Sequence, residues 1–276
     1  MVNETFDSKR FGRYFRYDLS QFWHNNGKAA LLLGFLSVIT YLLWVGGCLV
    51  FTGTWQAPSV GMRLLFFSLG FIVLVFYQTR TYGYLTEKRA GQSWLMLPAS
   101  TLEKFISMMI ITILVIPFAY ILSYLALDSL IGLLDPTAGG LIVSSASGVL
   151  DGLGKALSAA SEEGLQINVM AFALPLLLQF VLNMLYFLLC GICFKKWKIL
   201  GGIGVVMGLQ MVFTPIVSSL VYKYWTPILT EQSFNEDPIQ SLSIVNGIIN
   251  YATITNAVVV IGLAVAIYYR LKTLKH

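Results

Sequence analysis

The stretch GYLTEKRAGQSWLMLPASTLEKF, residues 83–105, separates the second and third apolar runs of the chain. It opens with a charged group, residues 87–89, and continues into a short apolar patch, Trp94–Leu97, which Pro98 ends. An apolar patch held in water between two membrane spans needs another surface to cover it. We therefore expect this patch to dock on a partner.

The end of the same stretch carries a helix start signal. Ser100 and Glu103 have the S-x-x-E spacing of a capping box, and an apolar run follows directly. In such a box the serine hydroxyl accepts from the N–H of the third helical residue, and the glutamate reaches back to the N–H of the serine. The pattern predicts a helix that begins at about Thr101.

Composition places the chain in the membrane. Its 276 residues are 57% hydrophobic and 11% charged, and the mean hydropathy is +0.75. Six apolar runs each approach or exceed the roughly 20 residues that an α-helix needs to cross the hydrocarbon core. The runs are about 29–51, 61–79, 102–127, 169–194, 199–222 and 245–269. We expect an all-α integral membrane protein with six transmembrane helices.

The cations predict the orientation. Fifteen of the 18 Lys and Arg residues lie in segments that six spans would place on one side: Lys9, Arg10, Arg13, Arg16, Lys28, Arg80, Lys88, Arg89, Lys104, Lys195, Lys196, Lys198, Arg270, Lys272 and Lys275. The other side holds Arg63, Lys155 and Lys223. By the positive-inside rule both termini are cytoplasmic. The net charge of +5 then reflects topology and contact with anionic membrane lipid, and we expect no nucleic acid partner.

The expected organisation has two parts. Phe11, Phe15, Leu19 and Phe22 recur at helical spacing and predict an amphipathic helix in the membrane interface, which serves either as a lipid anchor or as a helix gripped by a cytoplasmic partner. The parts are residues 1–28 as the interface helix and 29–276 as the six-span domain, with a cytoplasmic coupling segment (80–104), an external loop (128–167) and an external segment (223–245).

Polar and small residues inside the runs have two interpretations each. Polar side chains in spans make interhelical hydrogen bonds, which we favour, or line a translocation path. These side chains are Gln179, Asn183, Gln210 and Asn250. Gly204 and Gly208 form a G-x-x-x-G pattern, which predicts close packing of two helices within the subunit or between subunits.

Signs of catalysis are scarce. Apart from Glu103 at the start of the third run, the apolar runs offer no carboxylate for a proton relay, and the two His residues, His24 and His276, form no metal motif. The C-x-x-C of Cys190 and Cys193 lies in an apolar run, where we expect packing rather than metal or redox chemistry. We expect no catalytic residue, no metal site and no cofactor bound by this chain.

Taken together, the charged group, glycine, apolar patch and Leu-Pro-x-Ser resemble the cytoplasmic segment between spans two and three of ABC transporter permeases of the type-2 (export) family, in versions similar to those of Bacteroides-type bacteria. The matching residues are Glu87, Lys88, Arg89, Gly91, Leu95, Leu97, Pro98 and Ser100. Gln92–Trp94 departs from the Thr-x-acid common in that family, so the role of that acid is not carried over.

The resemblance implies a function. Such permeases are multi-pass proteins of the bacterial cytoplasmic membrane. Two of them pair, often as a homodimer, and each docks on a separate ATPase subunit that binds ATP and Mg²⁺. Trp94, Leu95 and Leu97 would then fill a groove on the ATPase, and residues 87–89 would pair around its rim. The alternatives are a membrane scaffold that transports nothing, and a membrane enzyme, which the missing acids and histidines disfavour.

Overall fold

The structure is a chain of helices. It is a computed structural model, and it describes residues 6–144, 169–208, 210, 211, 215, 219 and 238–273. Within these residues no strand is present, which confirms the all-α prediction for this part of the chain. The elements in chain order are α1 (Ser8–Gly34), α2 (Leu36–Thr52), α3 (Val60–Thr81), η1 (Gly83–Thr86), α4 (Lys88–Leu95), α5 (Thr101–Ile110), η2 (Ile111–Val115), α6 (Ile116–Leu134), η3 (Pro136–Ala138), α8 (Val169–Cys193) and α10 (Pro238–Lys272).

Four helical segments are long and apolar enough to cross a membrane. They are Val60–Thr86, Thr101–Leu134, Ala173–Cys193 and Ile249–Lys272. Two further apolar helices, Leu36–Thr52 and Lys198–Gly208, are shorter. The second of these leads into the predicted run 199–222, most of which lies outside the described residues. The chain is therefore a multi-pass membrane protein with four candidate spans in its described part.

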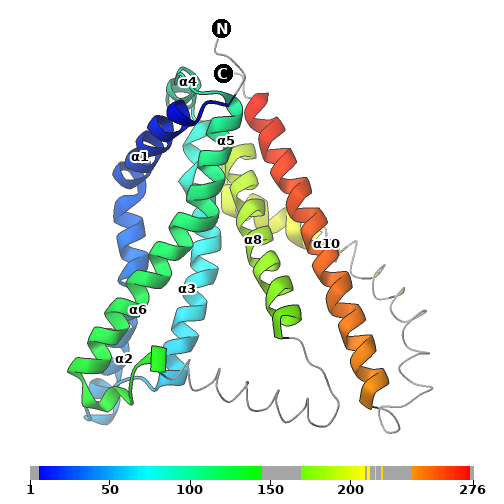
Figure 1. Ribbon diagram of the computed structural model, residues 1–276. Coiled ribbons are helices and arrows are strands. Elements are labelled where there is room, and N and C mark those ends of the chain that lie inside the picture. Colours follow the sequence, from blue (N-terminus) through cyan, green and yellow to red (C-terminus); the bar gives the residue numbers. More distant parts are fainter. Residues whose placement is uncertain are drawn as a thin grey trace.

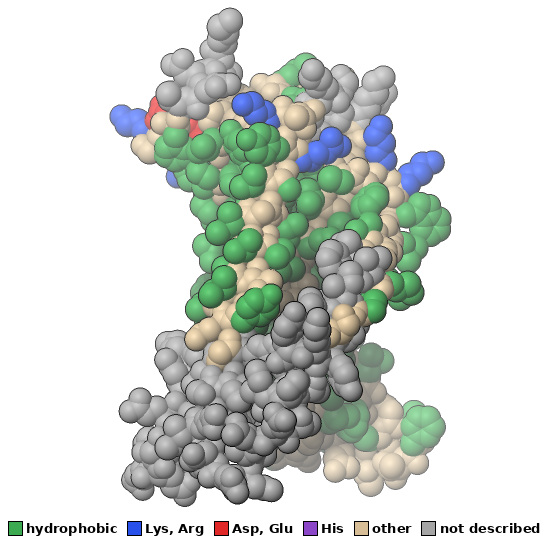
Figure 2. Space-filling view, turned by 90° about the vertical axis from the view of Figure 1, so that its right-hand side faces the viewer, with side chains coloured by type: hydrophobic (Ala, Val, Ile, Leu, Met, Phe, Trp, Pro, Cys, Tyr) green, Lys and Arg blue, Asp and Glu red, His purple; other side chains and the backbone are tan. Residues whose placement is uncertain are grey.

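The helices diverge from one end of the molecule. Figure 1 shows α4 at this end, together with the start of α5 and the last turns of α10, and we call it the α4 end. From there α1, α2 and α6 run to one side of α3, and α8 and α10 run to the other. The Lys and Arg side chains in Figure 2 gather toward the α4 end, and hydrophobic side chains cover much of the described surface below them.

No helix begins at residue 29, the predicted start of the first span. Helix α1 continues from Ser8 through Gly34, and the chain is interrupted only at Phe35 before α2 starts. Residues 29–33 are Ala and Leu, the strongest helix formers, so nothing in the sequence stops the helix at Lys28. Helix α1 therefore runs through the predicted boundary between the interface helix and the first span, and where the membrane begins stays a prediction. Helix α2 ends at Gly53, whose left-handed backbone (φ 67°) caps it.

The span from α5 to α6 carries an irregular turn. Residues Ile111–Val115 form a π-helical turn, directly before the α6 residues Ile116 and Pro117. Proline has no N–H to give to the preceding turn, and a π turn is one way to absorb that loss. The irregularity associated with Pro117 therefore lies in the turn that precedes it.

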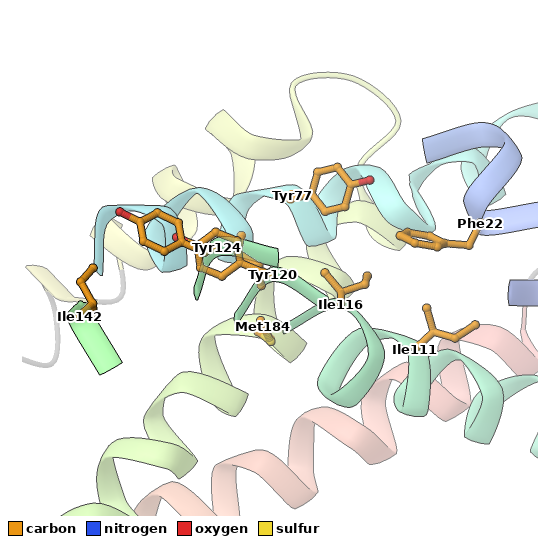
Figure 3. Close-up of a cluster of buried hydrophobic side chains, with 9 residues drawn as sticks. Phe22, Tyr77, Ile111, Ile116, Tyr120, Tyr124, Ile142 and Met184 are labelled. Carbon is orange, nitrogen blue, oxygen red and sulfur yellow. The ribbon is translucent and has the colours of Figure 1, made fainter. Parts of the chain in front are cut away.

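Aromatic side chains form much of the core between α1, α3 and α6. Figure 3 shows Phe22, Tyr77, Tyr120 and Tyr124 among its buried members. The ring of Tyr120 stacks on Phe67 at a centroid distance of 5.7 Å, and its hydroxyl donates to the Phe67 carbonyl. These contacts join α3 to α6 along their length.

The C-terminal end of α6 bears on two predictions. The helix extends to Leu134, so residues 128–134 of the predicted external loop are helical. Asp128 is therefore a carboxylate inside a candidate span, contrary to the expectation that the spans hold none beyond Glu103 at the start of the run. It is 2% exposed and forms an ion pair with Arg63 of α3 at 3.0 Å. A buried carboxylate needs such a partner, because an isolated charge is very costly in an apolar medium.

Candidate functional site at the α4 end

The capping box predicted at the start of α5 is present. The Ser100 hydroxyl accepts from the Glu103 N–H at 3.2 Å, and a Glu103 carboxylate oxygen accepts from the Ser100 N–H at 3.0 Å. A cap of this kind contributes about 1 kcal/mol to helix stability. It sets where α5 begins and how the preceding segment enters it.

Glu103 also binds α1, which the sequence did not indicate. Its Oε1 accepts from the Asp7 N–H at 2.9 Å and from Arg10 Nη2 at 2.7 Å, and Arg10 Nε donates to Oε2 at 2.8 Å. The Glu103 side chain has no exposed area. The hydrogen bond to Glu103 raises the pKa of Arg10. One carboxylate thus joins the starts of α1 and α5.

We call α4 together with the starts of α1 and α5 the α4 corner. Trp94 lies inside this corner rather than on its surface. It is 3% exposed, and its indole N–H donates to the Tyr14 hydroxyl of α1 at 3.1 Å. The Lys104 ammonium lies 4.7 Å from the centroid of the indole ring and donates to the Trp94 carbonyl at 3.0 Å. Lys104 therefore satisfies a carbonyl at the C-terminal end of α4 and holds α4 to α5. Trp94 is thus buried against Tyr14 of α1 and in a core cluster with Leu85 and Met108, so the surface predicted for it is absent in this chain, and its role in binding a partner stays a prediction.

A polar stripe on α1 makes these contacts. Arg10, Tyr14 and Asp18 recur every four residues, which places them on one face of the helix. Asp18 Oδ2 accepts from the Tyr82 hydroxyl at 3.0 Å and from the Ser107 hydroxyl at 2.6 Å. Burial raises the pKa of Asp18. The stripe thus joins α1 to α3, α4 and α5.

This stripe differs from the apolar face predicted for the N-terminal helix. The most buried α1 positions are Tyr14, Asp18, Phe22 and Asn26, at 3–9% exposure. The predicted residues other than Phe22 are only half-buried: Phe11, Phe15 and Leu19. Hydrophobic spacing missed the buried face because two of its members, Asp18 and Asn26, are polar.

The described exposed residues of the α4 corner include apolar side chains beside polar ones, Glu87, Gln92 and Ser93. Met96 is 83% exposed and Leu95 is 37% exposed. Leu97 is half-buried, Gly91 is buried, and Pro98 and Glu87 are exposed. Lys88 and Arg89 lie in the first turn of α4, and their side chains are outside the described residues. Of the residues that match the family segment, Glu87, Leu95 and Pro98 are therefore exposed, and Met96 beside them is also exposed.

Three of the four residues predicted to line a translocation path lie on two neighbouring helices, and the fourth, Gln210, lies outside them. Gln179 and Asn183 lie on α8, and Asn250 lies on α10, which packs along α8. Gln179, Gln210 and Asn250 are exposed, and Asn183 is half-buried. Their role in a path stays a prediction.

The close glycine contacts are at other positions than predicted. A Cβ added to Gly204 or Gly208 would meet no described atom within 4 Å, so within the described chain these glycines pack against nothing. A Cβ on Gly191 would lie 2.6 Å from the Thr79 carbonyl oxygen, which shows that α8 and α3 meet backbone to backbone there. Gly191 lacks a second glycine four residues away, so the motif search could not find it.

Neither a metal site nor a known relative is found. Within the described ranges, no three His, Cys, Asp or Glu side chains lie close enough to hold a metal ion. A scan against protein-family models finds no matching family, and searches of curated proteins and of solved structures find no match for the chain. The functional argument therefore depends on the geometry of the α4 corner.

Proposed function

We propose that this chain is the membrane-spanning permease subunit of an ATP-driven exporter, in which a separate ATPase subunit binds and hydrolyses ATP with Mg²⁺. The observation that carries the proposal is the α4 corner. Helix α4 has eight residues, lies between two candidate spans, and is held by side-chain contacts to Tyr14 of α1 and to Lys104 in the first turn of α5. A short helix held in this way can transmit the movement of a bound partner outside the membrane to the spans.

The contacts define what would move with α4. Lys104 links it to α5, Trp94 links it to α1 through Tyr14, and Asp18 of α1 in turn contacts α3 and α5. A displacement of α4 would therefore carry α1, α3 and α5 together. Interfaces of this kind shift as packed bodies, because close-packed side chains do not deform continuously.

The surface that an ATPase would bind is narrower than the sequence suggested. Met96 and Leu95 are exposed apolar side chains at the end of α4, and Glu87 and Pro98 on either side of them are also exposed. A few apolar anchors surrounded by polar groups are typical of interfaces with a small energetic centre. The proposed interface is therefore centred on Leu95 and Met96, and Trp94 supports it from below.

The topology belongs to the same proposal. We infer six spans, with the α4 end in the cytoplasm of a bacterium and the chain in its cytoplasmic membrane. The support is the fifteen-to-three distribution of cations along the sequence, together with Lys and Arg side chains that gather toward the α4 end in Figure 2. Reporter fusions after Lys104 and after His276 should be cytoplasmic, and a fusion at 140–160 should be external. An external C-terminus would contradict the six-span topology.

A second copy of the permease completes the proposed assembly. Gly204 and Gly208 are free of contacts within the described chain, so a close helix contact at this G-x-x-x-G would have to involve another chain or the part of this one that is not described. Such a contact would support a homodimer with one ATPase subunit on each permease.

The central experiment is a pull-down from native membranes. Leu95→Ala with Met96→Ala should reduce the amount of ATPase that copurifies, because truncating an interface anchor commonly costs about 2 kcal/mol. Phe118→Ala with Leu122→Ala is the matched control, since these two α6 residues are 67% and 61% exposed and lie far along the chain from α4.

The outcomes separate the alternatives. Loss of ATPase in the α4 variant alone supports coupling through this corner. An equal yield of ATPase from both variants would remove α4 from the interface. If the wild-type protein brings down no ATPase, the transporter proposal fails and the scaffold alternative takes its place.

A further inference from the structure

An elongated apolar groove lies between α1 and the α5–α6 span. Its volume is about 580 Å³, within the range of about 300–1,000 Å³ that small-molecule sites occupy. Phe22, Tyr77, Ile116 and Tyr120, which are labelled in Figure 3, form part of its wall. On α5–α6 the lining extends from Val115 to Leu127, which is roughly 18 Å of helix at 1.5 Å per residue. That length is close to one leaflet of a hydrocarbon core about 30 Å thick.

The groove opens toward the membrane. Among its lining residues, Trp23 is 58% exposed and Phe35 is 48% exposed, and Ala119 is also exposed. The interruption between α1 and α2 at Phe35 forms part of the wall. A ligand could therefore enter sideways from the lipid.

The polar groups that line the groove differ in whether the protein already supplies their partners. The Tyr77 hydroxyl donates to the Asn26 carbonyl, the Tyr120 hydroxyl donates to the Phe67 carbonyl, and the Ser123 hydroxyl donates to the Ala119 carbonyl of its own helix. These groups are already satisfied by the protein. Arg16 is the charged residue of the lining, and it makes no ion pair with a described residue.

Arg16 lies where a headgroup would be. It belongs to the α4-end half of α1, and Lys and Arg side chains gather toward this end of the molecule in Figure 2. Arg16 and Trp23 are seven residues apart, two helical turns, so both point from the same face of α1 into the groove. A guanidinium at headgroup level and an indole at the edge of the hydrocarbon are the usual arrangement at a membrane interface.

From this geometry we propose that the groove binds one anionic phospholipid of the adjacent leaflet, with an acyl chain along α6 and its phosphate on Arg16. The apolar wall fits the chain, and the guanidinium fits a phosphate, which it can bind through two parallel hydrogen bonds. The inference does not depend on the transporter proposal, because the site is complete within one chain and its occupancy is measured without an ATPase.

The test measures lipid retained by the purified full-length protein. The wild type, solubilised in a mild detergent and stripped of excess lipid, is titrated with phosphatidylglycerol or phosphatidylcholine and observed by native mass spectrometry. We expect one phosphatidylglycerol per chain, preferred about fivefold over phosphatidylcholine, the ratio that corresponds to about 1 kcal/mol for one interfacial cation.

Two pairs of variants test the two ends of the site. Arg16→Gln should abolish the preference for phosphatidylglycerol, Arg16→Lys should largely keep it, and Arg13→Gln is the matched control, since Arg13 is exposed on the same helix and does not line the groove. Ala119→Trp should fill the groove and lose the bound lipid. Leu122→Trp places the same side chain on the exposed face of α6, outside the groove, and should retain the lipid.

Three results would overturn the proposal. One is a wild-type protein that retains no lipid at a ratio of one per chain, or retains a free fatty acid in place of a phospholipid. A second is an equal effect of Arg13→Gln and Arg16→Gln. The third is equal lipid retention by Ala119→Trp and Leu122→Trp, provided that both variants elute as monodisperse protein.

Discussion

Asp128→Asn is expected to destabilise the protein strongly. The Arg63 and Asp128 side chains are 3% and 2% exposed, and Arg63 Nη1 donates to both carboxylate oxygens of Asp128 at 3.1 and 3.0 Å. The amide can accept one of these bonds and carries no charge, so the guanidinium stays buried without a counter-ion. Breaking a buried pair in this way costs about 3–5 kcal/mol. We expect the lower end of this range because one hydrogen bond survives.

The other contacts of Arg63 sharpen the expectation. Its Nη2 donates to the carbonyls of Ala138 and Gly140, at 2.7 and 2.5 Å. Arg63 therefore fastens α3 to α6 and to the turn that follows α6. Replacing both charges, Arg63→Met with Asp128→Leu, removes the unpaired charge but leaves those two carbonyls without this donor. The double variant should therefore recover part of the lost stability and not all of it.

The assay is thermal unfolding of the detergent-solubilised protein, followed by intrinsic fluorescence. A loss of about 3 kcal/mol corresponds to a decrease in Tm of roughly 6–12 °C for a chain of this size. Arg13→Gln, an exposed cation on α1, should change the Tm very little and serves as the control. An Asp128→Asn protein that melts within about 1 °C of the wild type would refute the assignment of this pair as a clamp between α3 and α6.

Three further predictions concern the carboxylates outside the spans and the glycines. The hydrogen bond from Tyr41, with further donors, lowers the pKa of Asp135. The stability that the ionised carboxylate contributes is therefore present above the ordinary pKa of Asp, near 4, and is lost progressively as the pH falls below that value. The Tm difference between the wild type and Asp135→Asn should be smaller at pH 3 than at pH 7, and a constant difference would contradict this. Burial raises the pKa of Asp18, so its ionisation opposes folding as the pH rises above 4. The oxygen of Asp18→Asn can still accept hydrogen bonds from both hydroxyls, so the free energy of unfolding of this variant should lie within about 1 kcal/mol of the wild-type value at pH 7. A large loss of stability would show that the charge itself is needed. Gly191→Ala should lower the Tm because its Cβ would lie 2.6 Å from a backbone oxygen, whereas Gly204→Ala should leave the Tm of the monomer unchanged; the opposite order would mean that the sequence motif identified the true helix contact.

Local sequence patterns predicted the features that depend on neighbouring residues. Composition and the length of the apolar runs indicated a helical membrane protein, because each span must satisfy its own backbone within one segment. The start of α5 was predicted correctly, since Ser100 and Glu103 bond to each other across a single turn. The α4 corner itself was located by its charges and Pro98, which interrupt the apolar pattern.

Contacts between distant parts of the chain were decided by tertiary structure alone. Trp94 appeared to be a docking residue because its cover, Tyr14, lies 80 residues earlier. Asp128 appeared to belong to a loop because its partner, Arg63, lies 65 residues away. Hydrophobic spacing indicates which faces are apolar, but a polar side chain is buried only where another element supplies its hydrogen bonds. For this reason the sequence by itself determined the class of the protein and the start of α5, whereas the packing of α1 against α3, α4 and α5 decided which residues of the corner are support and which remain exposed.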